Sequence, residues 1–276
     1  MKRKNYTPKI LDDEMIKDGL CAVSTLSDGE FSRENYFVVG GVAVQSYLPS
    51  SCRRPTSDID LAVLKPLCKE DFKKFAESAF QYLSDRGYKV ASEKARRAFC
   101  LTFEKGDEAN FISFAMHNHR SFRDIEDILY REKSHTRHKI VEGRVDSYEV
   151  ASPEDISIRK IARAINRLER NPLFEEHVNA MRRLDSENIK LAIENMNSMR
   201  EGLYENYEHS RAEKLRFIAD LHDIRLLSEL TGFNVPYFIE AIGSWDTLSH
   251  ESFEKDLILR AVLPSNLRVS EALLNH

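Results

Sequence analysis

The pattern of apolar and polar positions differs between the two halves of the chain and predicts two kinds of structure. Short runs of β-branched and aromatic residues, bounded by glycine or polar residues, are typical of strands. They occur at residues 36–39, 59–64, 88–91, 98–103, 111–116 and 141–150. Between them, the apolar spacing predicts helices within the first thirty residues and at residues 43–48 and 69–87. We therefore expect a mixed α/β region at the amino-terminal end.

From residue 152 onward, helical spacing replaces the strand pattern. The stretch Ser152-Pro153-Glu154-Asp155 is a strong helix start, with serine as N-cap, proline at the first position and acids in the first turn. Helices are predicted at residues 153–168, 174–183, 186–206 and 211–230 and in parts of 236–274. The expected fold class is α+β, with a small mixed-sheet domain at residues 1–150 and an α-helical bundle domain at residues 151–276.

Composition and charge narrow the class of protein. The chain has 276 residues, of which 42% are hydrophobic and 31% are charged, a balance typical of globular domains. Its net charge of -4 means that a nucleic-acid partner would have to be bound by a local basic patch. No signal-peptide core and no apolar run of about 18 residues is present, so we expect a cytoplasmic protein that does not enter a membrane.

Asp58 and Asp60 are the first candidates for chemistry. Because they are two residues apart on a predicted strand, both carboxylates point to one side, while Ile59 and Leu61 point to the other. Two adjacent carboxylates repel each other unless a cation lies between them, and Mg²⁺ commonly takes one or two carboxylates together with phosphate oxygens. The pair predicts a metal–nucleotide site. An Asp-x-Asp motif is also compatible with a solvated strand edge.

A glycine pair strengthens the interpretation of a nucleotide site. Gly40 and Gly41 end one strand, and Asp58 follows Gly41 by 17 residues. Glycine lets the backbone approach a phosphate closely, and the amides at the start of the following helix are donors for the same anion. Ser57 is a further candidate for contacting that phosphate. The alternative is that the two glycines only form a tight turn.

These motifs resemble the nucleotidyltransferase superfamily with a DNA polymerase β-type palm, whose signature is a Gly-Gly or Gly-Ser turn followed by hydrophobic-Asp-hydrophobic-Asp. Within it, the chain looks most like the AbiEii-type and MenT-like nucleotidyltransferase toxins. Further stretches carry this resemblance: Ser152-Pro153-Glu154-Asp155, then Lys160 with Arg163 and Arg167, and finally Asp220-Leu221-His222-Asp223-Ile224. It spans roughly residues 36 to 230, with long unmatched stretches between the motifs.

The resemblance implies an enzyme that moves a nucleoside monophosphate from a nucleoside triphosphate to an acceptor hydroxyl and releases pyrophosphate. The implied catalytic residues are Asp58, Asp60, Lys160, Asp220 and Asp223, of which Asp58 and Asp60 hold Mg²⁺. The implied nucleotide-binding residues are Gly40, Gly41, Ser57 and Arg163. The first helix of the helical domain would pack on the active site and complete it. By the same resemblance, the acceptor is RNA, particularly tRNA, and the protein is a toxin of a toxin–antitoxin or phage-defence pair with a cognate antitoxin.

The residues themselves leave alternatives open in the helical half. Lys160, Arg163 and Arg167 lie opposite an apolar stripe of the helix that begins at Pro153, where they could bind phosphate or form a solvated face. Asp220 and Asp223 share a helix face, since they are three residues apart. They could act in the site or form ion pairs, for instance with Arg163 or with Arg216.

One departure from the family pattern concerns a third carboxylate. Many of these enzymes place it on a later strand beside the first two, whereas residues 111–116 contain no acid. Glu104, Asp107 and Glu108 are the nearest candidates. Two other functions therefore remain open: a non-catalytic member of the fold that binds a nucleotide or a partner, and a nucleotidyltransferase acting on a small molecule of the aminoglycoside type.

Overall fold

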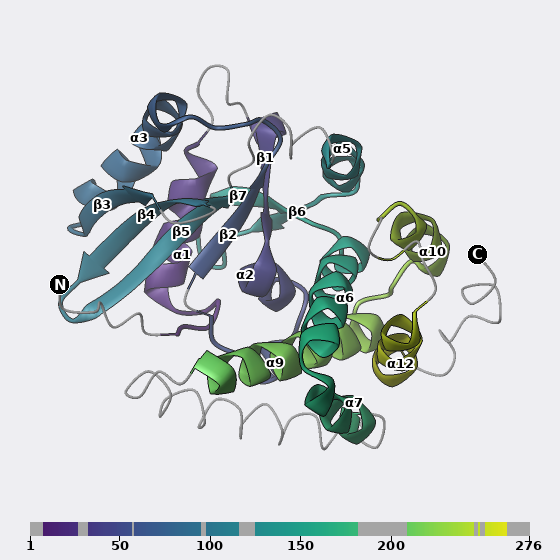
Figure 1. Ribbon diagram of the computed structural model, residues 1–276. Helices are drawn as coiled ribbons and strands as arrows, with labels where there is room; N and C mark the ends of the chain where they lie inside the picture. Colours follow the sequence, from purple (N-terminus) through teal and green to yellow (C-terminus); the bar gives the residue numbers. More distant parts are fainter. Residues whose placement is uncertain are drawn as a thin grey trace. The chain divides into compact units, whose positions relative to one another are not determined.

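The computed structural model divides into two compact units (Figure 1). One unit comprises Met1–Ser46 and Arg53–Ser152, and the other comprises Tyr47–Cys52 and Pro153–His276. The structure describes residues 8–26, 33–56, 58–94, 98–115, 125–181, 209–245, 248 and 252–263.

The first unit is built on a seven-stranded mixed sheet with the strand order β3-β4-β5-β2-β1-β7-β6. The strands are β1 (Tyr36–Val39), β2 (Asp58–Val63), β3 (Lys89–Lys94), β4 (Ala98–Lys105), β5 (Glu108–Ala115), β6 (Arg137–Ile140) and β7 (Ser147–Val150). β2 pairs antiparallel with β1 and parallel with β5, whereas β1 pairs parallel with β7. Together with the helical second unit, this sheet confirms the predicted α+β class.

Two helices cover one face of the sheet: α1 (Glu14–Ser24) and α3 (Lys69–Asp85). Gly19 brings α1 so close that a Cβ atom there would lie 2.5 Å from Cδ1 of Ile59. From α3, the ring of Phe72 stacks on Phe99 with centroids 4.8 Å apart and meets the edge of Phe114. The core of this unit therefore lies on the side of the sheet to which Ile59 points.

Some elements differ from the prediction. α2 (Gly40–Gln45) begins at the glycine pair and not at residue 43. The strand predicted at residues 141–150 is confined to β7, and it is preceded by α5 (Glu126–Ser134) and β6, which the apolar pattern did not predict. The reason is that α5 buries only Leu129 and Glu132, while β6 has a largely exposed, basic sequence. Short 3₁₀ turns lie at Arg33–Asn35, Ser50–Cys52 and Pro172–Phe174.

The second unit is helical, as predicted. Its described helices are α6 (Pro153–Arg170), α7 (Glu175–Met181), α9 (His209–Leu230), α10 (Val235–Gly243) and α12 (Phe253–Val262). α6 packs against α9, α10 and α12 around a core that includes Ile161, Phe217 and Phe238. The helix predicted at residues 186–206 lies outside the described residues. Within the described part of the chain, no helix combines the length and apolarity needed to cross a bilayer.

Candidate functional site

The Asp pair lies at the start of β2, on the face of the sheet opposite α1 and α3. Along this strand Ile59 and Leu61 are buried, while Asp58 and Asp60 are partly exposed. This alternation agrees with the prediction that both carboxylates point to the same side. The strand therefore presents two neighbouring acids on one face and buries its apolar residues under α1 and α3.

The glycine pair lies directly against this acidic motif. The antiparallel register of β1 and β2 places Val39 opposite Asp60, so Gly40 follows at the same end of the sheet. Gly40 has a φ of 73°, and a Cβ atom there would lie 2.2 Å from Oδ2 of Asp60. A Cβ atom at Gly41 would lie 2.7 Å from Oγ1 of Thr56. Each glycine thus leaves space that a side chain of the acidic segment occupies.

Thr56 is a residue of this site that the sequence did not identify. Its hydroxyl donates a hydrogen bond of 2.9 Å to Oδ1 of Asp58. Its backbone is held in turn by two hydrogen bonds of 2.8 Å with Lys9. Thr56 therefore holds one oxygen of Asp58 in place, and a hydroxyl two residues before an acid on extended backbone could have signalled this. Ser57 lies outside the described residues.

Ser113 occupies the position beside Asp60 on the neighbouring strand. The parallel register of β2 and β5 pairs Asp60 with Ser113 and Asp58 with Phe111. Of the candidate acids, Glu108 lies at the start of β5, where its carboxylate contacts Nζ of Lys9 at 2.5 Å. The strand next to the Asp pair thus carries a hydroxyl at the place where a third carboxylate would complete the site.

Cys100 lies on the same side of the sheet as the Asp pair and is influenced by its negative charge. On β4 it pairs with Ser113. Burial raises the pKa of its thiol to about 11, and the charges of Glu93, Asp60 and Asp58 add to that increase. A thiol two strands away from the Asp pair is therefore influenced by both carboxylates. A bound cation would neutralise this negative potential.

The donor set of the Asp pair fits Mg²⁺. Carboxylate oxygens are hard ligands, and the two acids lie on one face of a strand, next to backbone that a Cβ atom would fill. Among the described residues, no group of three or more His, Cys, Asp or Glu side chains is arranged to hold a metal ion. Asp58 and Asp60 would accordingly supply two positions, and phosphate oxygens and water would supply the others.

A second constellation lies within the helical unit, between α6 and α9. Nζ of Lys160 lies 2.9 Å from Oδ1 of Asp220 and 2.8 Å from Oδ2 of Asp223. Two arginines from α6 contact the same aspartate: Arg163 at 2.7 Å from Oδ1 and Arg167 at 2.6 Å from Oδ2. The three residues predicted from the Lys and Asp-x-x-Asp motifs are thus in direct contact.

The electrostatics of this cluster are those of buried charges that compensate one another. Burial by itself raises the pKa of Asp220, but the charges of Lys160, Arg163 and Arg167 outweigh it and hold the pKa well below its usual value. Lys160 is buried, whereas the side chain of Arg163 is half exposed. The ion-pair interpretation therefore has direct geometric support for Arg163, whereas Arg216 contacts Glu213 at 3.1 Å.

Comparisons with known proteins add little to this geometry. No family model matches the chain, and no curated protein does. One similar solved structure is an antigenic nucleotidyltransferase-like protein from Paracoccidioides brasiliensis, with 13% sequence identity and a TM-score of 0.37 over 87% of this chain and 84% of that one. A likeness at this TM-score carries no argument, so any assignment of function rests on the site residues.

Proposed function

We propose that this protein is a Mg²⁺-dependent nucleotidyltransferase that moves a nucleoside monophosphate from a nucleoside triphosphate to an acceptor hydroxyl. The observation that supports it most strongly is the contact between the glycine pair and the Asp pair. Gly40 has the left-handed backbone conformation, and its α-carbon adjoins Asp60 so closely that no side chain fits. Backbone that can approach phosphate thus lies next to carboxylates that can hold a metal ion.

The residues of the sheet have separate roles in this proposal. Asp58 and Asp60 hold Mg²⁺, which when bound stabilises the charge of the phosphates and orients them. Thr56 keeps the Asp58 carboxylate in one orientation through its 2.9 Å hydrogen bond. The backbone at Gly40 and Gly41 forms the wall against which the phosphates lie.

Lys160 and Arg163 are proposed to neutralise negative charge on the triphosphate. Lys160, Arg163 and Arg167 face Asp220 and Asp223, and Arg167 also contacts Glu213 at 3.1 Å, so three cations meet three carboxylates. The half-exposed guanidinium of Arg163 is the part best able to receive a phosphate oxygen. In this scheme Asp220 and Asp223 hold the ammonium group of Lys160 in position.

The acceptor and the biological role are proposed from the family resemblance. RNA, in particular tRNA, would be the acceptor in the cytoplasm, and a cognate antitoxin would restrain the enzyme. The motifs that support this proposal are Asp58-Ile59-Asp60, Lys160 and the pair Asp220 and Asp223.

The test is transfer of radiolabelled nucleotide. Purified protein is incubated with Mg²⁺, each α-labelled nucleoside triphosphate in turn, and total RNA or purified tRNA. We expect label in RNA with the wild type and a loss of at least about a hundredfold with Asp58→Asn, because that change removes charge from the metal site. Asp85→Asn, which alters an exposed acid at the end of α3, is the matched control and should retain activity.

The hydroxyl of Ser113 beside Asp60 favours one competing function, a non-catalytic nucleotide-binding protein. In that case Mg²⁺ and triphosphate bind to the wild type and binding is lost in Asp58→Asn, but no label enters RNA. Label that enters a small hydroxylated amine and never RNA would instead indicate transfer to a small molecule. Either result would overturn the proposed RNA acceptor.

A further inference from the structure

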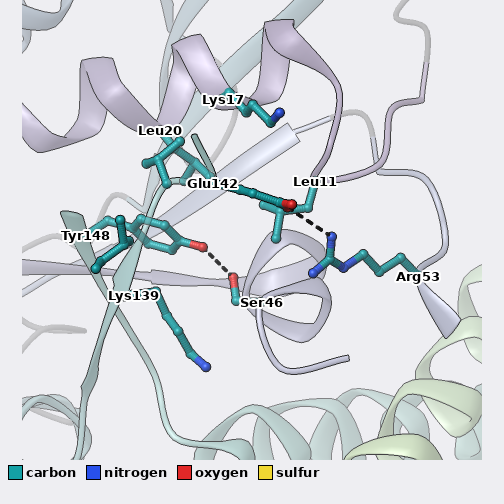
Figure 2. A pocket seen from close by; sticks show the side chains of 10 residues that line it. Leu11, Lys17, Leu20, Ser46, Arg53, Lys139, Glu142 and Tyr148 are labelled. Atoms are coloured by element: carbon teal, nitrogen blue, oxygen red, sulfur yellow. Dashed lines mark hydrogen bonds and ion pairs between the residues drawn. The ribbon is translucent and has the colours of Figure 1, made fainter. Parts of the chain in front are cut away.

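A small pocket in the sheet unit lies apart from the Asp pair. It is enclosed by the start of α1, the end of α2 and the two strands β6 and β7, and its volume is about 110 Å³. Its polar lining consists of Lys17, Ser46, Arg53, Lys139, Glu142 and Tyr148 (Figure 2).

The strand register shows that this pocket and the Asp pair belong to different faces of the sheet. Tyr148 lies two residues before Val150, which pairs with Val38, and Val38 pairs with Leu61. These residues all point to the face that α1 covers, whereas Asp60 points to the other. The pocket is therefore not an extension of the proposed nucleotide site.

Two hydroxyl groups in the pocket are oriented by a hydrogen-bond relay. The hydroxyl of Ser46 donates to the carbonyl oxygen of Val42 at 2.9 Å and lies 2.8 Å from the hydroxyl of Tyr148. Because the hydroxyl hydrogen of Ser46 is used in the hydrogen bond to Val42, the hydroxyl of Tyr148 is the donor in the second bond. Burial raises the pKa of Tyr148, which keeps the phenol protonated near neutral pH. Figure 2 shows the two hydroxyls pointing toward each other.

Arg53 is a cation held in a fixed place at the same pocket. Its Nε donates to the carbonyl oxygen of Gln45 at 3.1 Å, and its Nη1 forms an ion pair with Asp12. Nη1 also lies 4.0 Å from the carboxylate of Glu142, whose side chain is 69% exposed. A contact of that length to an exposed acid is weak, so an anion in the pocket can compete with Glu142 for this guanidinium.

Lys139 adds a second cation whose charged form is disfavoured by its surroundings. Burial lowers the pKa of Lys139, and the neighbouring charge of Arg137 on the same strand lowers it further. Both effects are opposed when an anion binds nearby. Lys17, in the first turn of α1, is the third cation of the lining, and its Nζ lies 3.3 Å from the carboxylate of Glu14. Because Glu14 is exposed, this ion pair is weak and an anion can compete with it.

We propose that this pocket binds a phosphate group. Three cations and a single carboxylate line it, and the exposed Glu142 is the only carboxylate of the lining with which an anion must compete for Arg53. Its volume of about 110 Å³ is well below the roughly 300–1,000 Å³ of pockets that hold drug-sized ligands. The phosphate is either an inorganic ion or one phosphate of a nucleic-acid backbone, and both sources present the same oxygens.

The experiment measures phosphate binding to the full chain by calorimetry at low ionic strength. We expect inorganic phosphate to bind the wild type with a Kd near or below about 1 mM. Lys139→Gln should weaken binding at least about tenfold, since it removes a charged donor. Glu142→Gln should tighten it several-fold, because the competing carboxylate is gone. Lys74→Gln and Glu77→Gln, which make the same changes of charge at exposed positions of α3, should leave the Kd unchanged.

The two sources are distinguished by competition with a short oligoribonucleotide. If the oligoribonucleotide displaces phosphate from the wild type, and binds Lys139→Gln more weakly, the pocket takes a backbone phosphate. If phosphate binds without such competition, the pocket takes the free ion. The proposal is overturned if the wild type binds neither ligand, or if Lys139→Gln and Glu142→Gln bind phosphate as Lys74→Gln does. Equal thermal melting of all four variants confirms that each is folded.

Discussion

At Gly40 two physical requirements meet in one residue. Its φ of 73° is a conformation that costs an L-residue roughly 1–2 kcal/mol. In addition, its missing side chain leaves the space that Oδ2 of Asp60 occupies. Gly87 and Gly106 also have positive φ angles, but nothing lies within 4 Å of a Cβ atom at either position. Gly40 is thus constrained by its backbone and by its neighbour together.

Gly40→Ala and Gly87→Ala therefore form a matched pair for a first prediction. Both substitutions should cost roughly 1–2 kcal/mol of unfolding free energy for the backbone conformation. Only Gly40→Ala should additionally displace Asp60 and so abolish Mg²⁺ and triphosphate binding. Urea denaturation and calorimetric titration measure the two effects. Equal triphosphate binding by both variants would contradict the role given to Gly40.

Lys160 and Asp220 form the core of the buried charge cluster in the helical unit. Each is at most 3% exposed, and the two groups are 2.9 Å apart. Removing one member of such a pair leaves the other charge buried without its partner, which typically costs about 3–5 kcal/mol. The same contact therefore matters for stability, whatever its part in phosphate binding.

Asp220→Asn yields a prediction that depends on pH. The pKa of Asp220 is lower in the folded protein than in the unfolded chain, where it is about 4. The ionised Asp220 therefore contributes its full stability above about pH 4, and this contribution is lost as the pH falls below that value. At pH 7 the variant should be less stable than the wild type by about 3–5 kcal/mol. Below about pH 4 the difference should narrow. Urea denaturation at several pH values measures it, with Asp107→Asn as the control at an exposed acid. A difference independent of pH would rule out the ion pair as its cause.

Among the elements, β2 and β5 determine the composition of the metal site. The apolar pattern of the chain predicts both strands, and the absence of an acid at residues 111–116 is visible in the sequence. Only the parallel pairing shows that Ser113 is the residue beside Asp60, because a register shifted by one residue would place Ile112 there. The element is predictable from local spacing, whereas its register depends on contacts across the sheet.

Ser113→Asp tests that register. A third carboxylate beside Asp60 should tighten the binding of Mn²⁺, used as a probe for Mg²⁺, by several-fold or more. Without a cation, the same variant should be less stable than the wild type, since like charges repel across neighbouring strands. Ser113→Asn is the uncharged control of the same shape. Titration with Mn²⁺ and urea denaturation measure both effects, and equal Mn²⁺ affinity of the two variants would place the metal elsewhere.

Other elements show where local spacing is not sufficient. α3 and α6 were predicted because their apolar residues recur at helical intervals and are buried. α5 and β6 carry mainly polar residues, so their backbone structure has little trace in the apolar pattern. α5 is tied to the sheet through Lys133, which donates to the carbonyl oxygen of Tyr36 and forms an ion pair with Glu149.

At the scale of the whole molecule, the chain passes between its two units three times. The short stretch Tyr47–Cys52 belongs to the helical unit, although the residues on either side of it belong to the sheet unit. Gln45, just before this stretch, accepts a hydrogen bond from Arg53, just after it. The two ends of the stretch Tyr47–Cys52 are therefore held close together by this hydrogen bond within the sheet unit.

Ligand binding should be measurable as stabilisation of the whole chain. If triphosphate and Mg²⁺ bind the folded protein only, a concentration of 100 times Kd should add about 2.7 kcal/mol. For a protein of this size, that corresponds to a rise in Tm of roughly 5–10 °C. Asp58→Asn should remove the shift, and Lys74→Gln should keep it. Differential scanning fluorimetry with and without Mg²⁺ measures this, and a shift that persists in Asp58→Asn would locate the nucleotide outside the Asp pair.

The sequence by itself determined the α+β class and the helical second half. It also identified two motifs of candidate site residues, the glycine pair with Asp58 and Asp60, and Lys160 with Asp220 and Asp223. Each of these depends on residue types at short, fixed spacing. The alternation at Asp58 and Asp60 follows from strand geometry alone. Tertiary structure alone decided that Gly40 adjoins Asp60, that Thr56 holds Asp58 and that Lys160 meets Asp220 and Asp223. It also decided the phosphate-sized pocket around Ser46, Arg53 and Tyr148. These contacts join residues from separate segments or depend on side-chain conformation, which the local apolar pattern does not record.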